Sequence, residues 1–269
     1  MARHPVLGRG TACAAIEEGR GDRERTVRSL GKSGKSGAPY RPDKPEKPEK
    51  PMIEIIPSIL VQSADEFERR LRLVEDGCLT VHVDVLDGTL FPFVSWFDAS
   101  RVGTLRTPVR YELHLMVENP LPIIEAWRKE VPGFMRAIVH AEIKRPLGAV
   151  LDQIAACNLE AGIAMNPETP IHEVHPFAHR IHQLTVMGVH PGASGQSFLG
   201  EPILEKMRSI AEHFADLPVE IDGGVTSELL PVLIGAGATR LCAASSLFGA
   251  SDPLVTLRHM RETASTYDA

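Results

Sequence analysis

The sequence predicts an α/β fold, a (β/α)₈ barrel spanning residues 52–269, and three observations support this fold class. Short apolar segments rich in Val, Ile and Leu alternate with amphipathic segments of helical spacing. Eight such pairs follow one another, in a stretch of the length that such barrels need. The apolar segments are near-continuous, as expected for parallel strands that are buried on both faces. The expected strands are residues 52–59, 79–85, 109–116, 136–141, 160–165, 181–189, 217–222 and 239–244.

Three of the expected helices carry recognisable start signals. Ser63, followed three residues later by Glu66, forms a capping-box pattern ahead of the first helix. Residues 199–215 place apolar side chains at helical spacing, and Asp252-Pro253 puts proline at the first position of the last helix. A doubly wound open sheet is the alternative arrangement of these elements. The first strand is not followed by a G-x-G-x-x-G turn, which weakens that alternative.

Residues 1–51 differ in composition from the rest of the chain. They contain 12 basic and 7 acidic side chains and end in a Pro/Lys/Glu repeat. Such a segment cannot bury enough apolar area to offset the loss of chain entropy, so we expect a disordered N-terminal extension. A secretory signal needs an apolar run, which residues 1–51 lack. A transit peptide is poor in acidic residues, whereas residues 1–51 contain seven. A mis-set start is the other interpretation, with Met52 as the true first residue of a catalytic barrel domain 52–269.

The composition excludes several classes of protein. Hydrophobic residues make up 43% and charged residues 24%, which is typical of a globular chain. Residues 52–269 carry a net charge of −11, so we expect no nucleic-acid partner, which would require clustered cations. No apolar run approaches the roughly 20 residues of a membrane-spanning helix, so no membrane association is expected. The cysteines are scattered without a C-x-x-C pair, as expected for reduced thiols in the cytoplasm: Cys13, Cys78, Cys157 and Cys242.

Unusual polar residues gather at the ends of the expected strands, where (β/α)₈ barrels carry their chemistry. His82 and Asp84 are two residues apart on one strand, so both side chains lie on the same face. That face is the barrel interior, because the valines that alternate with them can face the helices. His114 ends the next strand and Asp222 ends the seventh. Two imidazoles and two carboxylates suit one divalent metal ion such as Zn²⁺, Mn²⁺ or Fe²⁺.

Each of these residues has a simpler explanation when it is taken alone. A single histidine at a strand end is usually a hydrogen-bonded core residue, and a single Asp-Gly-Gly is usually a turn. The four together favour a metal site, because a barrel core does not otherwise need four ligand-type side chains in one mouth. His140 and Glu142 are expected to face the barrel, where they either support the site or are only structural. His182, at a strand start, is expected to be structural.

Blocks of residues around the expected strand ends carry a resemblance to a known family. The blocks are residues 56–60 (IPSIL), 82–88 (HVDVLDG), 112–120 (ELHLMVENP), 164–167 (AMNP), 186–187 (VM), 191–192 (PG), 195–198 (GQSF) and 220–225 (EIDGGV). In this order and spacing they resemble the ribulose-phosphate 3-epimerases over residues 52–263. The resemblance implies the ribulose-phosphate-binding barrel. It also supports Met52 as the start, because such proteins commonly begin near a Met-x-x-x-x-Pro-Ser pattern.

The resemblance implies specific roles for the strand-end residues. His82 and His114 match metal ligands, and so do Asp84 and Asp222, which also match the catalytic acid/base pair. Ser58 lies at the position of a residue near the substrate and the metal. The expected cofactor is one divalent metal ion, with Zn²⁺ as the first choice and Fe²⁺, Mn²⁺ or Co²⁺ as alternatives.

The expected reaction interconverts D-ribulose 5-phosphate and D-xylulose 5-phosphate, a step of the pentose phosphate pathway. Epimerising carbon 3 of a 2-ketose removes a proton next to the carbonyl and returns one to the opposite face. A metal on the substrate oxygens would stabilise the enediolate. Carboxylates on opposite strands would place one acid/base group on each face. The expected partner is a small-molecule ketose phosphate, and the resemblance implies a homo-oligomer.

The phosphate is expected at the loops that follow the last strands, where such barrels often bind it. Gly223 and Gly224 offer backbone amides, and Ser245 and Ser246 follow the eighth strand. Residues 192–195 form a small-residue loop suited to a mobile lid. The expected substrate contacts are Ser58, His114, Met116, Met187, Gly192, Ser194, Gly195, Gly223, Gly224, Ser245 and Ser246.

The sequence departs from the family pattern around the substrate. The Gly-Phe-Gly-Gly-Gln loop reads GASGQ at residues 192–196. Ala244 replaces the glycine of an Ala-Gly-Ser motif, and its methyl group would obstruct phosphate if the backbone needed a positive φ. The loop after the second strand contains Leu90-Phe91-Pro92-Phe93 where the family has Val-Pro-Asn, and Leu86 stands where the family often has Met. These changes leave two alternatives open: an epimerase of another ketose phosphate such as D-allulose 6-phosphate, or a metal-binding barrel without turnover.

Overall fold

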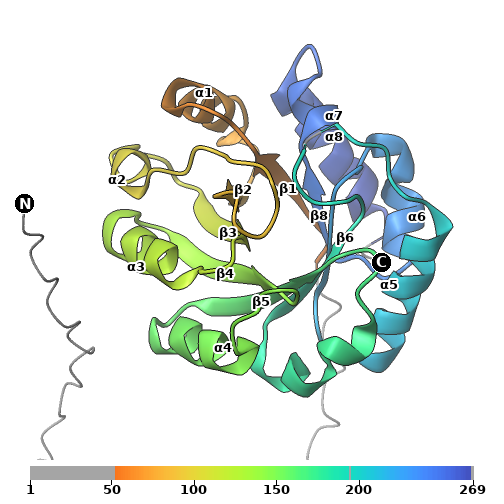
Figure 1. Ribbon diagram of the computed structural model, residues 1–269. Helices are drawn as coiled ribbons and strands as arrows, with labels where there is room; N and C mark the ends of the chain where they lie inside the picture. The colour runs from red at the N-terminus through yellow and green to blue at the C-terminus, as the bar shows by residue number, and fades with distance from the viewer. Residues whose placement is uncertain (1–51, 194, 268–269) are drawn as a thin grey trace, which may run out of the picture. The chain divides into compact units, whose positions relative to one another are not determined.

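A closed parallel barrel is the central feature of the computed structural model, which describes residues 52–193 and 195–267. The predicted extension 1–51 and Ser194 lie outside the described residues. Eight parallel strands pair in chain order, and the eighth pairs with the first (Figure 1). The predicted (β/α)₈ fold is therefore confirmed, and the closed ring contradicts the open doubly wound sheet. The strands are β1 (Glu54–Ile59), β2 (Thr80–Leu86), β3 (Arg110–Met116), β4 (Phe134–His140), β5 (Glu160–Met165), β6 (Gln183–Met187), β7 (Val219–Asp222) and β8 (Arg240–Ala243).

Helices surround the strands, and the local signals place their starts correctly (Figure 1). The side chain of Ser63 accepts a hydrogen bond from the amide of Glu66 at 3.3 Å at the start of the first helix. Asp252 caps the last helix by accepting from the amide of Val255 at 3.0 Å. No helix in the described part of the chain is both long and apolar enough to cross a membrane. The helices are α1 (Ala64–Val74), α2 (Ala99–Val102), α3 (Leu121–Glu130), α4 (Leu147–Ala156), α5 (Glu201–His213), α6 (Leu230–Gly235), α7 (Ser245–Phe248) and α8 (Pro253–Ser265).

The connection from β5 to β6 departs from the regular repeat that the sequence predicted. Its described residues form two 3₁₀ turns, η1 (Ile171–Glu173) and η2 (His175–Arg180), and no α-helix. Pro170 precedes the first turn and Pro176 lies in the second. Proline lacks the amide hydrogen that an α-helix needs in its interior, so closely spaced prolines favour short turns. A third such turn, η3 (Ser227–Leu229), leads into α6.

Alternation along the strands separates an apolar outer face from a polar inner face. On β2, Val81, Val83 and Val85 belong to the fully buried apolar core. His82 and Asp84 lie between them and face the interior, as predicted. The register then sets their neighbours, because Asp84 pairs with His114 of β3 in the sheet. Polar side chains from strands far apart in the sequence therefore meet at the carboxyl end of the barrel.

Candidate active site at the barrel mouth

The four residues predicted to hold a metal lie together at the carboxyl ends of β2, β3 and β7. One donor atom from each of the four lies within 4.8 Å of the other three: His82, Asp84, His114 and Asp222. Nδ1 of His114 lies 3.0 Å from Oδ1 of Asp84 and 3.2 Å from Oδ2 of Asp222. Nε2 of His82 lies 3.4 Å and 4.0 Å from the same two carboxylate oxygens. The side chains therefore converge on one small volume.

The donor set and its burial suit a divalent cation. His82 and His114 are fully buried, and Asp84 and Asp222 are only 6% and 8% exposed. Nε2 of His82 is buried and has no hydrogen-bond partner among the described residues. An unpaired buried polar atom costs free energy, and a cation at this point would pair it. Two imidazole nitrogens and two carboxylates are ligands that Zn²⁺, Mn²⁺ and Fe²⁺ accept.

The two carboxylates draw positive charge into the metal-free site. Burial raises the pKa of Asp84, but the neighbouring imidazoles of His114 and His82 outweigh it and hold that pKa below its ordinary value. Burial lowers the pKa of His114, yet Asp222 and Asp84 outweigh this effect and raise it to about 9. Protons on the imidazoles and a metal cation therefore compete for the same place.

A cavity at the barrel mouth gives access to the two carboxylates. Asp84 and Asp222 both line it, and so do Ser58, Met116 and Met187. Ser58 donates a hydrogen bond of 2.8 Å from Oγ to Oδ2 of Asp84. With Oδ2 held in this way, Oδ1 of Asp84 is the oxygen that faces the imidazoles.

Most residues expected at the phosphate end of the substrate also border this cavity. The lining includes Gly192, Gly195, Gly223, Gly224 and Ser245. Ser246 is not part of the lining, and its hydroxyl donates to the carbonyl of Val225 at 2.7 Å. Gly224 has a φ of +73°, and a side chain there would meet the backbone of Phe198 at 2.7 Å. The loop after β7 therefore packs against the loop after β6 so closely that only glycine fits.

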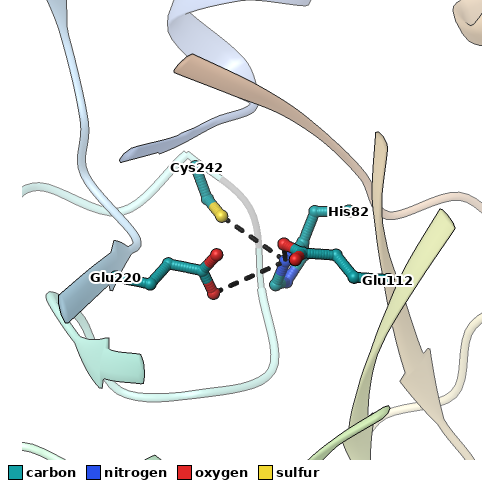
Figure 2. Close-up of side chains that lie close together, drawn as sticks. All are labelled: His82, Glu112, Glu220 and Cys242. Carbon is teal, nitrogen blue, oxygen red and sulfur yellow. Dashed lines mark hydrogen bonds and ion pairs between the residues drawn. The ribbon is translucent and has the colours of Figure 1, made fainter. Parts of the chain in front are cut away.

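A second group of buried side chains lies on the other side of His82, and the sequence analysis missed it. Figure 2 shows Glu112, Glu220 and Cys242 pointing toward the His82 ring. Nδ1 of His82 lies 2.8 Å from Oε1 of Glu112 and 3.4 Å from Sγ of Cys242. The two-residue period carried the signal, because Glu112 precedes His114 by two residues and Glu220 precedes Asp222 by two.

Arg136 of β4 balances the charge of this buried group. It forms ion pairs with Glu112 and Glu160. Burial raises the pKa of Glu112, but His82 and Arg136 outweigh it and lower the pKa to about 2. Burial and the charge of Glu112 raise the pKa of Glu220 to about 8. At neutral pH, Glu112 is therefore ionised and Glu220 carries a proton.

His140 and Glu142, whose roles the sequence left open, continue the site beyond His114. Nε2 of His140 lies 2.9 Å from Nε2 of His114, and the two rings are inclined by only 16°. Nδ1 of His140 lies 2.8 Å from Oε2 of Glu142. Burial lowers the pKa of His140, so its ring is neutral at neutral pH. His182, by contrast, accepts the amide hydrogen of Ala161 at 3.2 Å, a contact that fits the expected structural role.

The segments that depart from the family pattern border the mouth. The ring of Phe91 packs edge-on against His140, with 5.1 Å between centroids. A Cβ added to Gly192 would lie 2.1 Å from the ring of Phe93, so the loop after β2 contacts the loop after β6. Ala244 has a φ of −118°, so the position does not require the positive φ that favours glycine. The condition under which this methyl group was expected to obstruct phosphate, a positive φ, is therefore not met.

Comparison with known proteins identifies relatives along most of the barrel. Residues 54–248 match the model of the Ribulose-phosphate 3 epimerase family. The chain is 32% identical over 220 residues to a ribulose-phosphate 3-epimerase, cytoplasmic isoform, of Oryza sativa subsp. japonica; the alignment covers 78% of this chain and 93% of that protein. It is 31% identical over 217 residues to the ribulose-phosphate 3-epimerase of Bacillus subtilis (strain 168), covering 78% and 99%.

Solved structures of lower sequence identity share the fold. KGPDC from Streptococcus mutans in complex with D-R5P matches with a TM-score of 0.65 at 12% identity, over 80% of this chain and 98% of that one. The 3-hexulose-6-phosphate synthase of Salmonella typhimurium matches with a TM-score of 0.63 at 10% identity, over 80% and 100%. At such low identity the likeness shows the barrel architecture.

Proposed function

This chain belongs to the ribulose-phosphate 3-epimerase family and is an epimerase of that family, and we propose that it interconverts D-ribulose 5-phosphate and D-xylulose 5-phosphate with one bound divalent metal ion. The proposed ligands are His82, Asp84, His114 and Asp222. The observation that carries the proposal is the convergence of their donor atoms within 4.8 Å beside a cavity that both carboxylates line.

Asp84 and Asp222 are the proposed acid/base pair. Their strands, β2 and β7, are separated in the ring by β1 and β8, so the two carboxylates reach the cavity from different sides. One carboxylate would remove the proton from carbon 3, and the other would return a proton to the opposite face. The imidazoles that lower the pKa of Asp84 keep it ionised, as a base must be before it accepts a proton.

The remaining residues of the cavity have supporting roles in this proposal. A divalent cation in the four-ligand site would stabilise the negative charge that develops on the substrate oxygens. Ser58 orients Asp84 through the 2.8 Å hydrogen bond to Oδ2. Met116 and Met187 give the cavity an apolar wall that excludes water from the reacting carbon. Gly224 and Ser245 border the end of the cavity proposed for phosphate.

An assay of metal-depleted and reloaded protein tests the proposed substrate. The full chain is stripped with a chelator, reloaded with Zn²⁺, Mn²⁺, Fe²⁺ or Co²⁺, and given D-ribulose 5-phosphate or D-allulose 6-phosphate. We expect metal-dependent turnover of D-ribulose 5-phosphate. Faster turnover of D-allulose 6-phosphate would favour the alternative, an epimerase of another ketose phosphate. That alternative is tested because Phe91 and Phe93, in a loop that departs from the family pattern, lie at the mouth. Absence of any epimerisation with all four metals contradicts the proposal.

Proton exchange in heavy water tests the two-base assignment separately. We expect Asp84→Asn and Asp222→Asn each to abolish epimerisation while each still exchanges the carbon-3 hydrogen of one epimer. The two variants should differ in which epimer they exchange, because each retains the base on one face. Metal content is measured for both variants, and Asp216→Asn, an exposed change, is the control. Epimerisation by either variant, or exchange of both epimers by one of them, would rule out the pair.

A further inference from the structure

The ring nitrogen that points away from the site is buried in both candidate histidine ligands. An imidazole binds a metal through a nitrogen without a proton, so its other nitrogen carries an N–H that needs an acceptor. In His82, Nε2 faces the site and Nδ1 points away. In His114, Nδ1 faces the site and Nε2 points away. Burial makes each acceptor necessary, since an unpaired N–H inside the barrel costs free energy.

Glu112 provides the acceptor for His82. Its Oε1 lies 2.8 Å from Nδ1 of His82, the shortest contact of that nitrogen in the group that Figure 2 shows. Its Oε2 accepts a hydrogen bond from Arg136. An ionised carboxylate can only accept hydrogen bonds, so the proton between Glu112 and His82 belongs to Nδ1. In the metal-bound state, Nε2 of His82 is then left with its lone pair directed into the site.

His140 provides the acceptor for His114. Its Nδ1 faces the Glu142 carboxylate at 2.8 Å and must therefore carry the proton. Its Nε2 then has a free lone pair, 2.9 Å from Nε2 of His114. The nearly parallel rings allow the linear N–H···N hydrogen bond that this distance suggests. When a cation replaces the proton on the side of the site, Nδ1 of His114 is thus the nitrogen without a proton, and it faces the two carboxylates.

Glu142 is itself held by the loop after β5. Its Oε1 accepts hydrogen bonds from the amide of Asn166 at 2.9 Å and from the hydroxyl of Thr169. Lys206 of α5 donates three hydrogen bonds, of 2.6 to 3.1 Å, to carbonyl oxygens of residues 166–169. A continuous chain of hydrogen bonds therefore runs from α5 through this loop to His114.

We propose that two buried hydrogen-bond chains fix the tautomers of the metal-facing imidazoles. Glu112 fixes His82, and His140, backed by Glu142, fixes His114. These three are positioning residues: Glu112 and His140 each act through a proposed ligand, Glu142 acts through His140, and none of the three lines the cavity. The inference rests on the proposed metal site and adds to it the reason why these two rings present the nitrogens they do.

A second cation is the competing explanation for the buried group in Figure 2. Donor atoms of His82, Glu112, Glu220 and Cys242 also lie within 4.8 Å of one another. In that arrangement Nδ1 of His82 would coordinate metal and carry no proton. The geometry opposes it: Arg136 already pairs with the Glu112 carboxylate, and Oε1 of that carboxylate lies 2.8 Å from Nδ1 of His82, the distance of a hydrogen bond that a proton on this nitrogen would make.

Nitrogen NMR of zinc-loaded protein with ¹⁵N-labelled histidine tests the tautomers directly. We expect His82 with a protonated Nδ1 and a metal-bound Nε2, and His114 with the reverse pattern. His140 should show a protonated Nδ1 and a free Nε2. The opposite tautomer in either ligand overturns the proposal. So does a His82 ring with no proton together with two metal ions per chain.

Metal affinity, measured by competition with a chelator, tests the role of His140 independently. His140→Gln keeps an acceptor near the position of Nε2, whereas His140→Phe keeps an aromatic ring and removes the acceptor. We expect His140→Phe to bind Zn²⁺ roughly 10 to 100 times more weakly than wild type, and His140→Gln to recover most of that loss. The control is His175→Phe in η2, outside the site, which should leave affinity unchanged.

The outcomes separate this inference from the proposed function. A wild-type protein that binds no divalent metal contradicts the proposed function itself. A wild-type protein that binds metal while His140→Phe binds equally tightly contradicts only the inference. The thermal midpoint of each metal-free variant is recorded as well. If the two His140 variants melt alike but differ in affinity, a purely structural role for His140 is excluded.

Discussion

Asp84 shows how one side chain is held by different partners at each of its polar atoms. Oδ2 accepts from Ser58 at 2.8 Å, and Oδ1 faces His114 at 3.0 Å. Its backbone carbonyl accepts from the hydroxyl of Ser95 at 2.8 Å, which ties the loop after β2 back to the strand. Of these three oxygens, only Oδ1 accepts no hydrogen bond from a hydroxyl group. The hydroxyl of Ser58 therefore decides which carboxylate oxygen is presented to the site.

Removal of the Ser58 hydroxyl should lower activity without unfolding the protein. A hydrogen bond to a charged group contributes about 1.5–3 kcal/mol, and part of this should appear in the transition state, where Asp84 must be aligned. We expect Ser58→Ala to reduce kcat by roughly tenfold. Steady-state kinetics measure the effect, with Ser265→Ala on α8 as the control. An unchanged kcat would show that Asp84 needs no such alignment.

Glu220 should make the metal-free protein less stable as pH rises. Its folded-state pKa is raised from 4.5 to about 8, so the folded protein keeps a proton that the unfolded chain releases. Stability therefore falls between pH 4.5 and 8 because of this group. Glu220→Gln mimics the protonated form at every pH. The thermal midpoint of the variant should fall less than that of wild type between pH 5.5 and 8.

An exposed glutamate provides the comparison for this pH effect. Glu205→Gln on α5 changes charge without touching the barrel interior, so its pH profile should parallel wild type. If Glu220→Gln parallels wild type as well, the buried carboxyl group is not the proton-binding site we assign.

At the residue scale, the sequence predicts the mouth of the barrel better than its interior. His82 and Asp84 were found because two ligand types share a strand at a period of two, next to the strand's end. Glu112 and Glu220 lie two residues before His114 and Asp222 on the same strands, and both are fully buried. A carboxylate is unexpected at such depth unless it has a partner. That partner, Arg136, comes from another strand, and its pairing depends on the register that the closed barrel sets.

At the element scale, the loops after β2 and β6 meet over the site. Phe93 belongs to the first loop and packs against Gly192 of the second. Gly192 has a φ of +126°, which only glycine adopts without strain. The two loops that depart from the family pattern are therefore in contact, and a change in one has to be accommodated by the other.

A side chain at Gly192 should disturb substrate binding through this contact. We expect Gly192→Ala to raise KM several-fold with a smaller effect on kcat, because the methyl group would displace Phe93. Phe93→Ala in the same chain should recover part of the loss, so the two effects are not additive. Gly235→Ala is the matched control, since a Cβ there meets no atom within 4 Å. Full additivity of the two changes would show that the loops act independently.

Local sequence signals correctly predicted the helices that begin with a side-chain cap. They failed between β5 and β6, where prolines disfavour an α-helix. Ser63 and Asp252 cap α1 and α8 as expected, because capping depends only on residues within one helical turn. A helix between β5 and β6 was expected from the regular alternation of segments. The structure has η1 and η2 there instead, because prolines disfavour an α-helix. β5 and β6 still pair with this shorter connection, so the barrel closes without that helix.

At the scale of the whole barrel, the metal site joins segments that are distant in the sequence. His82 and Asp222 lie 140 positions apart in the numbering and on strands that do not pair directly. A cation held between them is bound only by the folded chain. Binding energy therefore adds to the stability of the whole barrel rather than of one element.

Metal removal should lower the thermal midpoint of the full chain. At a free metal concentration of 100 times Kd, a single site adds about 2.7 kcal/mol to the free energy of unfolding. For a domain of this size, that corresponds to roughly 5–10 °C. Thermal unfolding with chelator and with added Zn²⁺ measures the difference. The double variant Asp84→Asn, Asp222→Asn should show a much smaller shift, and an equal shift would place the bound metal elsewhere.

The position of the bound metal tests the account most directly. Crystals of the zinc-loaded protein, measured on both sides of the zinc absorption edge, locate the ion by its anomalous signal. We expect one peak per chain, coordinated by Nε2 of His82, Nδ1 of His114 and the carboxylates of Asp84 and Asp222. A peak on the far side of His82, among Glu112, Glu220 and Cys242, or no peak inside the barrel, would contradict it.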